Sequence, residues 1–189
     1  MLWIFANGYD TSIVTPKDYE YPIKSVGNSL TACFDLVKDD EVKVLIYMLS
    51  ESVSSRLRKH NLKGRTIKIW IKDTELHGID RQGQLYKPTY ITYSIATKAF
   101  ELFQANWNWS KNVRALGVRV ANLEVANRYK QLTFLTDIEQ KHEPIEFCID
   151  EINNRYGRHA LHRAILLSDK RLFRSPFEAN QIHPLSYFR

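Results

Sequence analysis

The chain has 189 residues, of which 44% are hydrophobic and 12% aromatic, so it can bury the core of one domain and is not a disordered tail. No apolar run approaches the ~20 residues that cross a bilayer, and the first residues lack the basic start of a signal peptide. The formal net charge of +6 favours a polyanionic partner. Cys33 and Cys148 lie far apart, and we expect two free thiols in a reducing cytoplasm.

The charged residues are segregated along the chain. Residues 56–72 carry seven Lys and Arg residues without one acid, whereas residues 137–151 carry six acids and a single lysine. A charge run is usually a solvated face, but this basic run passes from a predicted helix end into a predicted strand. An anionic ligand would explain that continuity.

The hydrophobic pattern predicts the following elements in chain order. Residues 1–8 are typical of a helix end closed by Gly8, and the proline-containing residues 9–22 are typical of an extended linker. Residues 24–36 alternate as a strand. The remaining predictions are a helix capped by Asp39 or Asp40 and closed by Gly64, a strand over 65–73, a turn over 78–84, a strand over 85–94, a helix capped by Thr97, and a strand over 113–124.

This β-α-β-β-α-β order predicts an α+β, ferredoxin-like fold with one four-stranded sheet and both helices on one face. Small residues, hydroxyls and basic side chains on the open face suit a phosphate backbone. A plain solvated face is equally compatible with them. Alternation places on that face Ser25, Gly27, Ser29, Thr31, Lys68, Trp70, Lys72, Gly117 and Arg119.

The segments "KSVGNSLT", "RTIKIWIK" and "NVRALGVRVANLE" occur in this order with a basic helix end between the first two. Together they resemble the little-finger domain of Y-family DNA polymerases, the bacterial translesion enzymes of the polymerase IV and UmuC-like (ImpB/MucB/SamB) type. "LWIFANGYD" resembles the last helix of that family's thumb domain, and "FCIDEINNRYGRHALHRA" resembles a C-terminal segment of one branch. The resemblance implies a thumb end and linker over 1–23, a little finger over 24–126, a linker over 127–143 and a helical segment over 144–189.

The resemblance implies that the domain grips duplex DNA, the primer–template, through phosphates. The family's catalytic Mg²⁺ ions are held by carboxylates of a palm domain, for which this sequence has no counterpart. We therefore expect a monomeric chain that binds no cofactor and does not synthesise DNA alone, although its parent would be a DNA-directed DNA polymerase. The implied DNA-binding residues are Lys24, Ser25, Gly27, Asn28, Ser29, Thr31, Arg65, Lys68, Lys72, Arg114 and Arg119.

The stretch "QLTFL" resembles the Gln-Leu-x-Leu-Phe peptide with which polymerases of this family bind the bacterial sliding clamp, although its last two residues are inverted. The implied clamp-binding residues are Gln131, Leu132, Phe134 and Leu135. The alternative is a further strand, or an apolar strap packed on the domain's own helices.

Beyond this stretch the sequence predicts two helices outside the ferredoxin-like core, joined to it by a mobile linker. Pro144 fits the first helical position, and Gly157 would end the first helix before a second one starts near His159. The apolar stripe of the first helix is Ile145, Ile149, Ile152 and Tyr156. Its acidic side either faces solvent or packs on a basic region.

Two rival functions share the predicted element order. An RNA-binding module would need exposed aromatic residues on two adjacent central strands, where this sequence has mainly Gly, Ser, Thr and Ala. A ligand-binding ferredoxin-like module would leave the basic run over 56–72 unexplained. The three functions differ in whether the chain binds duplex DNA, single-stranded RNA or neither.

Overall fold

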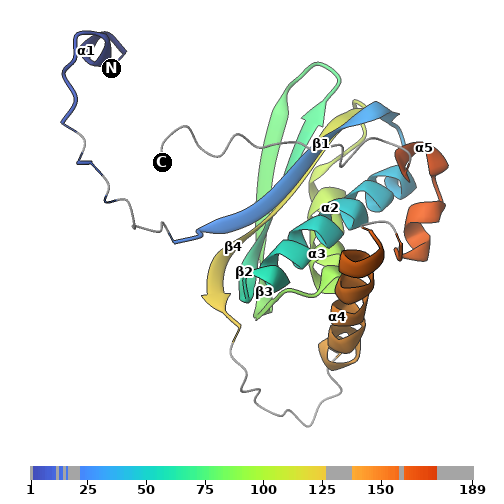
Figure 1. Ribbon diagram of the computed structural model, residues 1–189. Coiled ribbons are helices and arrows are strands. Elements are labelled where there is room, and N and C mark those ends of the chain that lie inside the picture. Colours follow the sequence, from blue (N-terminus) through green and yellow to red (C-terminus); the bar gives the residue numbers. More distant parts are fainter. Residues whose placement is uncertain are drawn as a thin grey trace. The chain divides into compact units, whose positions relative to one another are not determined.

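The computed structural model describes residues 2–11, 13–14, 16, 22–126, 138–157 and 160–173. The chain forms two compact units, of which the larger spans Ile23–Phe177. The described part of the smaller unit contains α1 (Leu2–Ala6), followed by Gly8 at φ +81°, as predicted. The larger unit contains β1 (Ser25–Leu36), α2 (Asp39–Lys59), β2 (Leu62–Asp73), β3 (Gly78–Thr89), α3 (Thr92–Asn106), β4 (Val113–Val125), α4 (Ile138–Tyr156), the 3₁₀ helix η1 (Ala164–Leu167) and α5 (Lys170–Phe173) (Figure 1).

The four strands form one antiparallel sheet in the order β1-β4-β2-β3. The two strands of each β-α-β unit are separated by a third strand. Strands β1 and β2, which α2 connects, have β4 between them, and strands β3 and β4, which α3 connects, have β2 between them. Helices α2 and α3 cover the same face of the sheet, and no helix or strand that the structure describes covers its other face, called the open face below (Figure 1). The predicted α+β fold class is confirmed, and this arrangement is the split β-α-β pattern.

The core lies between the sheet and the two helices. Alternate residues of β2, namely Ile67, Ile69 and Ile71, are buried because successive side chains of a strand point to opposite faces. The apolar stripe of α2 packs on them at helical spacing. The core-facing residues of the strands include Val26, Ala32, Leu36, Ile67, Ile69, Ile71, Leu116, Val118 and Val120, and those of the helices include Leu45, Leu49, Val53, Leu57, Ile95, Ala99 and Phe103.

The third strand lies earlier in the chain than predicted. Residues 78–84, predicted as a turn, belong to β3 and pair with β2, and the chain turns just before Gly78 instead. There the Oδ1 atom of Asp73 accepts the backbone N–H of His77 at 2.8 Å, and Leu76 has φ +70°. Because β3 ends at Thr89, α3 begins earlier than predicted as well.

The glycines of β3 caused that error. Glycine marks turns, but it also occurs in strands where another group approaches the backbone closely. A Cβ atom at Gly78 would come within 2.9 Å of Nε1 of Trp70, and one at Gly83 would come within 3.2 Å of Cδ2 of Leu102. Gly78 therefore needs a small residue for packing and not for a turn, whereas at Gly83 an added methyl group would displace only the ends of two side chains by a few tenths of an ångström.

Helix α2 also ends earlier than predicted. It stops at Lys59, and Asn61 at φ +53° turns the chain into β2. Gly64, predicted to close the helix, is a buried residue of β2. At the other end of α2, Asp39 and Asp40 lie in the first turn, whereas the residue before the helix, Lys38, makes no side-chain cap.

We expect Gly64→Ala to destabilise the domain by about 1–3 kcal/mol, the usual range for overpacking a core. The added methyl group would overlap Cγ1 of Val120 and lie 2.9 Å from Cδ2 of Leu123. Urea denaturation followed by circular dichroism measures the change. Gly83→Ala is the matched control, because its methyl group would meet only the mobile ends of Lys98 and Leu102. Equal midpoints for Gly64→Ala and the parent chain would contradict the packing described here.

The C-terminal elements differ from the prediction in two ways. Helix α4 begins at Ile138, so Pro144 lies inside the helix and not at its first position. The prediction that the helices within residues 144–166 lie outside the domain core is wrong at Leu166 of η1, which is buried in the core, and Leu172 of α5 is buried there as well. The end of α4 at Gly157, with φ +106°, is confirmed. The predicted linker over 127–143 lies largely outside the described residues.

Two further expectations concern the whole chain. Cys33 and Cys148 are both exposed, and neither forms a disulfide within the part of the chain that the structure describes. Among the helices that the structure describes, none combines the length and the apolar character that crossing a membrane requires.

Candidate nucleic-acid interface

The open face of the sheet is a grid of four rows, because strand pairing places residues of all four strands side by side. Antiparallel partners point to the same face, so each row can be read from the register. The rows are Ser25–Ala121–Thr66–Gln84, Gly27–Arg119–Lys68–Gln82, Ser29–Gly117–Trp70–Asp80 and Thr31–Ala115–Lys72–Gly78. The structure thus brings together seven predicted DNA-binding residues: Ser25, Gly27, Ser29, Thr31, Lys68, Lys72 and Arg119.

The basic residues of this open face are not neutralised. Among the described residues, Lys68, Lys72 and Arg119 have no carboxylate partner. Other cations of the domain do pair with acids, namely Arg58, Lys98, Lys111, Arg163 and Arg171. Asp80, at the β3 edge, is the acidic residue of the four rows. The open face therefore attracts anions, and its field is strongest over β4 and β2.

Two glycines shape this face. A Cβ atom at Gly27 would lie 3.0 Å from both Cβ and Cγ of Arg119, so the missing side chain lets Arg119 lie across β1. At Gly117 a Cβ atom would lie 3.1 Å from Cβ of Ser29 and 3.5 Å from Cε3 of Trp70. The middle of the sheet is consequently flat enough for a polymer backbone to approach it closely.

A hollow of about 430 Å³ lies at the outer edge of β1. Arg56 of α2 closes one side, where its Nη2 atom donates to the carbonyl oxygen of Gly27 at 2.6 Å. Arg56 from the helix-covered side and Arg119 from the open face thus lie at the same edge of β1. The hollow is lined by Ile23, Ser25, Val26, Gly27, Arg56, His60 and Arg119.

Four predicted DNA-binding residues lie outside the four rows. The side chain of Asn28 points to the helix side, where its Nδ2 atom donates to Oγ of Ser52 at 3.1 Å. The Nε atom of Arg65 donates to the carbonyl oxygen of Leu85 at 3.1 Å. Arg114 forms an ion pair of 3.4 Å with Asp35, which offsets its charge. Lys24 is exposed just before β1.

Sequence reasoning missed four residues of this region. Arg56 and His60 line the hollow, and their spacing of four residues on α2 was the available signal. Gln82 and Gln84 extend two rows of the grid, and the misplaced third strand hid them. The predicted clamp-binding residues, Gln131, Leu132, Phe134 and Leu135, lie outside the described residues.

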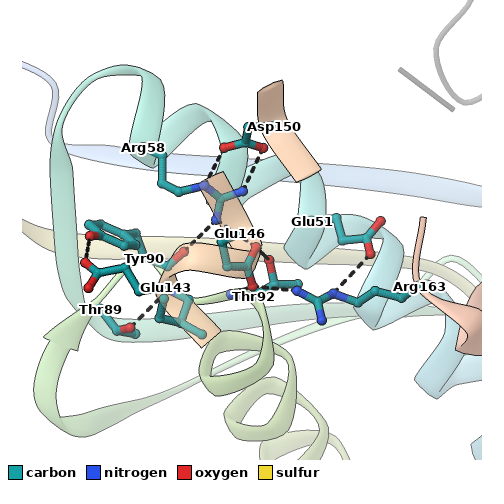
Figure 2. Close-up of polar contacts among 10 residues, drawn as sticks. Glu51, Arg58, Thr89, Tyr90, Thr92, Glu143, Glu146, Asp150 and Arg163 are labelled. Atoms are coloured by element: carbon teal, nitrogen blue, oxygen red, sulfur yellow. Dashed lines mark hydrogen bonds and ion pairs between the residues drawn. The ribbon is translucent and has the colours of Figure 1, made fainter. Parts of the chain in front are cut away.

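The basic run over 56–72 divides between two sites. Lys68 and Lys72 lie on the open face, but Arg58 is buried on the helix side among acidic residues of α4 (Figure 2). Its Nη1 atom lies 3.0 Å from Oε2 of Glu146, and its Nε atom lies 2.5 Å from Oδ2 of Asp150. The acidic side of α4 therefore packs on a basic region, which is one of the two predicted alternatives.

Glu51 of α2 belongs to the same polar cluster (Figure 2). Burial raises the pKa of its carboxyl to about 7, and the nearby Glu146 adds to this, while Arg163 and Arg58 oppose it. The Oε1 atom of Glu51 lies 3.2 Å from Nε of Arg163. Glu51 is thus a carboxyl group whose charge changes near neutral pH.

We expect the free energy of unfolding of the parent chain to fall as the pH rises from 5 to 8. In the Glu51→Gln variant this fall should be smaller. The folded state retains the Glu51 proton up to about pH 7, whereas the unfolded state loses it near 4.5, so deprotonation in this window costs the folded state. The side chain is 29% exposed, so solvent screening limits the effect to about 1–2 kcal/mol. Urea denaturation at pH 5, 6.5 and 8 measures it. Glu101→Gln, at an exposed pair with Lys98, should retain the parent slope; parallel curves for Glu51→Gln and the parent would refute the assignment.

The fold and the open face define an α+β domain with a basic, flat sheet surface. Residues 23–134 match the family model described as the impB/mucB/samB family C-terminal domain. This match covers more than half of the chain, and the chain belongs to the impB/mucB/samB family. The match ends before α4, so α4, η1 and α5 lie beyond the family domain.

Several relatives of the chain are named DNA polymerase IV. That of Acetivibrio thermocellus is 53% identical over 175 residues, which are 92% of this chain and 44% of the relative. That of Clostridium kluyveri is 34% identical over 161 residues, which are 81% of this chain and 40% of the relative. The chain thus spans about two fifths of the length of these relatives.

Among solved structures, a complex of beta-clamp processivity factor and little finger domain of PolIV matches with a TM-score of 0.45 and 16% identity. The match covers 60% of this chain and 99% of that one. At this similarity it supports no functional inference.

Proposed function

We propose that this chain is the DNA-gripping little-finger part of a translesion DNA polymerase of the polymerase IV type. The observation that carries the proposal is a set of three cations, Lys68, Lys72 and Arg119, which have no carboxylate partner among the residues that the structure describes and which lie on a flat sheet face with small and hydroxylated neighbours. Phosphate contacts of this kind position a duplex without reading its sequence. Nucleotide transfer is assigned to the palm carboxylates of the family, and we expect no DNA synthesis by this chain alone.

One backbone strand is proposed to follow β1. The hollow at the β1 edge combines Arg56, His60 and Arg119 with the hydroxyl of Ser25, a set that suits a phosphate group. The neighbouring rows then place Lys68 and Lys72 toward the next phosphates. With its cations directed at the phosphate backbone, this arrangement should bind duplex DNA with little sequence preference.

The proposal includes a contact with the bacterial sliding clamp through residues 131–135. It is supported by the resemblance of "QLTFL" to the family's clamp-binding peptide. Even a weak contact would raise the local concentration of the polymerase at the primer end, because tethering makes later binding steps intramolecular.

Comparing two labelled nucleic acids tests the proposed class of partner. We expect duplex DNA to bind in the non-specific range of about 10⁻⁴–10⁻⁶ M, and single-stranded RNA of equal length to bind more weakly. The open side of the central strands, β4 and β2, carries Trp70 as its aromatic residue, whereas RNA modules stack bases on both central strands. Tighter binding of the RNA would favour the RNA-binding alternative.

A further inference from the structure

Helix α4 is attached to the domain mainly through polar side chains. Within residues 141–156, its single buried side chain is that of Glu146, which is 2% exposed. Ile145 and Phe147 are about half exposed, and Tyr156 is exposed as well. The neighbouring η1 and α5 behave differently, since their Leu166 and Leu172 are buried in the core.

The carboxylate of Glu146 is held by four donors (Figure 2). It accepts the backbone N–H of Thr92 at 3.0 Å and the Thr92 hydroxyl at 2.8 Å. Arg58 and Arg163 supply the other two contacts, at 3.0 and 2.5 Å. These four donors form a complete site for one carboxylate. The two contacts from arginines are charge-assisted, and hydrogen bonds of this kind are stronger than those between neutral groups.

Glu146 also completes the first turn of α3. Thr92 is the first residue of α3, and the preceding Ile91 provides no side-chain cap. The first N–H groups of a helix have no partner within it and favour a negative charge nearby. Glu146, which lies 54 positions after Thr92 in the sequence, thus supplies the cap of α3.

Two more acidic residues extend the contact along the same side of α4. Asp150 binds Arg58 through both carboxylate oxygens, at 2.5 and 2.9 Å. Glu143 accepts the hydroxyl of Tyr90. Residues 143, 146 and 150 share one helix face because they are three and four positions apart. Aromatic contacts of Tyr90 with Phe147 and of Tyr93 with His142 flank these residues.

We propose that Arg58, Thr92, Arg163 and Tyr90 form a docking site for an acidic helix, which α4 occupies in the same chain and leaves as a unit while the domain stays folded. Apolar burial provides most of the stability of a domain, and α4 contributes little of it. The ion pairs must repay the desolvation of their own charges, so their net contribution to docking is small. Local opening of such an element requires less free energy than global unfolding.

Hydrogen–deuterium exchange of the full chain tests this proposal. In Glu146→Gln, we expect the amides of residues 141–156 to exchange about 10-fold faster or more, as loss of charged hydrogen bonds predicts. Amides of β2, β4 and η1 should keep their protection. Glu151→Gln, an exposed acid on the same helix, is the matched control and should leave all rates unchanged. Unchanged exchange of α4 in Glu146→Gln, or equal acceleration of α4 and the sheet, would overturn the proposal.

A second measurement tests whether the site recognises an acidic helix as a ligand. A synthetic peptide of residues 138–157 is added at ~1 mM, the scale of tethered local concentrations, to the Glu146→Gln chain. We expect the NMR signal of the Thr92 amide to shift with this peptide and to stay in place with a peptide that carries Glu146→Gln. Equal responses to both peptides, or none to either, would show that the contact is not a carboxylate-binding site.

Discussion

Replacing Lys68 and Arg119 together by alanine should weaken duplex-DNA binding by about 30-fold, at roughly 1 kcal/mol for each exposed charge-assisted contact. The two residues are neighbours in one row of the open face, and neither has a carboxylate partner among the described residues. Fluorescence anisotropy with a labelled duplex measures the loss. The fold should be unaffected, because both side chains lie on the solvent side of the sheet.

The control removes one cation from each of two helices on the covered side of the sheet. Lys98→Ala and Arg171→Ala together change the net charge by the same amount, but these residues pair with Glu101 and with Asp169. We expect this double variant to bind duplex DNA nearly as well as the parent chain. Equal losses in the two double variants would mean that net charge, and not the open face, determines binding.

Replacing Gln131 and Phe134 together by alanine should abolish binding to a purified bacterial sliding clamp. Interface energy is concentrated in a few anchor residues, and among residues 131–135 these two would supply the amide hydrogen bonds and the largest apolar side chain. Isothermal calorimetry measures clamp binding. Duplex-DNA affinity should stay the same, because the predicted DNA surface lies on another part of the chain.

Thr133→Ala is the matched control for the clamp experiment, since residue 133 is the variable position of the resembled peptide. It should bind the clamp like the parent chain. If the Gln131→Ala and Phe134→Ala double variant unfolds the domain, residues 131–135 are a structural strap. If it binds the clamp as before, the clamp contact lies elsewhere.

The sequence was sufficient for three of the four strands and for the residues that they place on the open face. Alternation with a period of two identified the outward residues of β1, β2 and β4, and the register confirms that they lie side by side. Strict alternation puts Asn28 on the opposite face from Gly27 and Ser29, and the structure shows its side chain on the helix side. Its inclusion among the DNA-binding residues came from the resemblance and not from the pattern.

The sequence was not sufficient where contacts join distant residues. In the sequence, Gly78 and Gly83 indicate a turn as readily as a strand. Only the packing of Trp70 and Leu102 against these glycines distinguishes a strand from a turn here. The segregation of basic and acidic runs suggested an internal contact but not its partners. Arg58 and Asp150 are separated by 92 positions, and Glu146 meets the start of α3 only in the folded domain.

The salt dependence of duplex-DNA binding tests the central claim most directly. The open face is proposed to bind through phosphates, so the logarithm of the association constant should fall linearly with the logarithm of the salt concentration. The slope should be less steep in the Lys68→Ala and Arg119→Ala double variant by about 2, or about one for each lost phosphate contact. A slope that is the same in both chains, or an affinity that does not change with salt, would contradict the account.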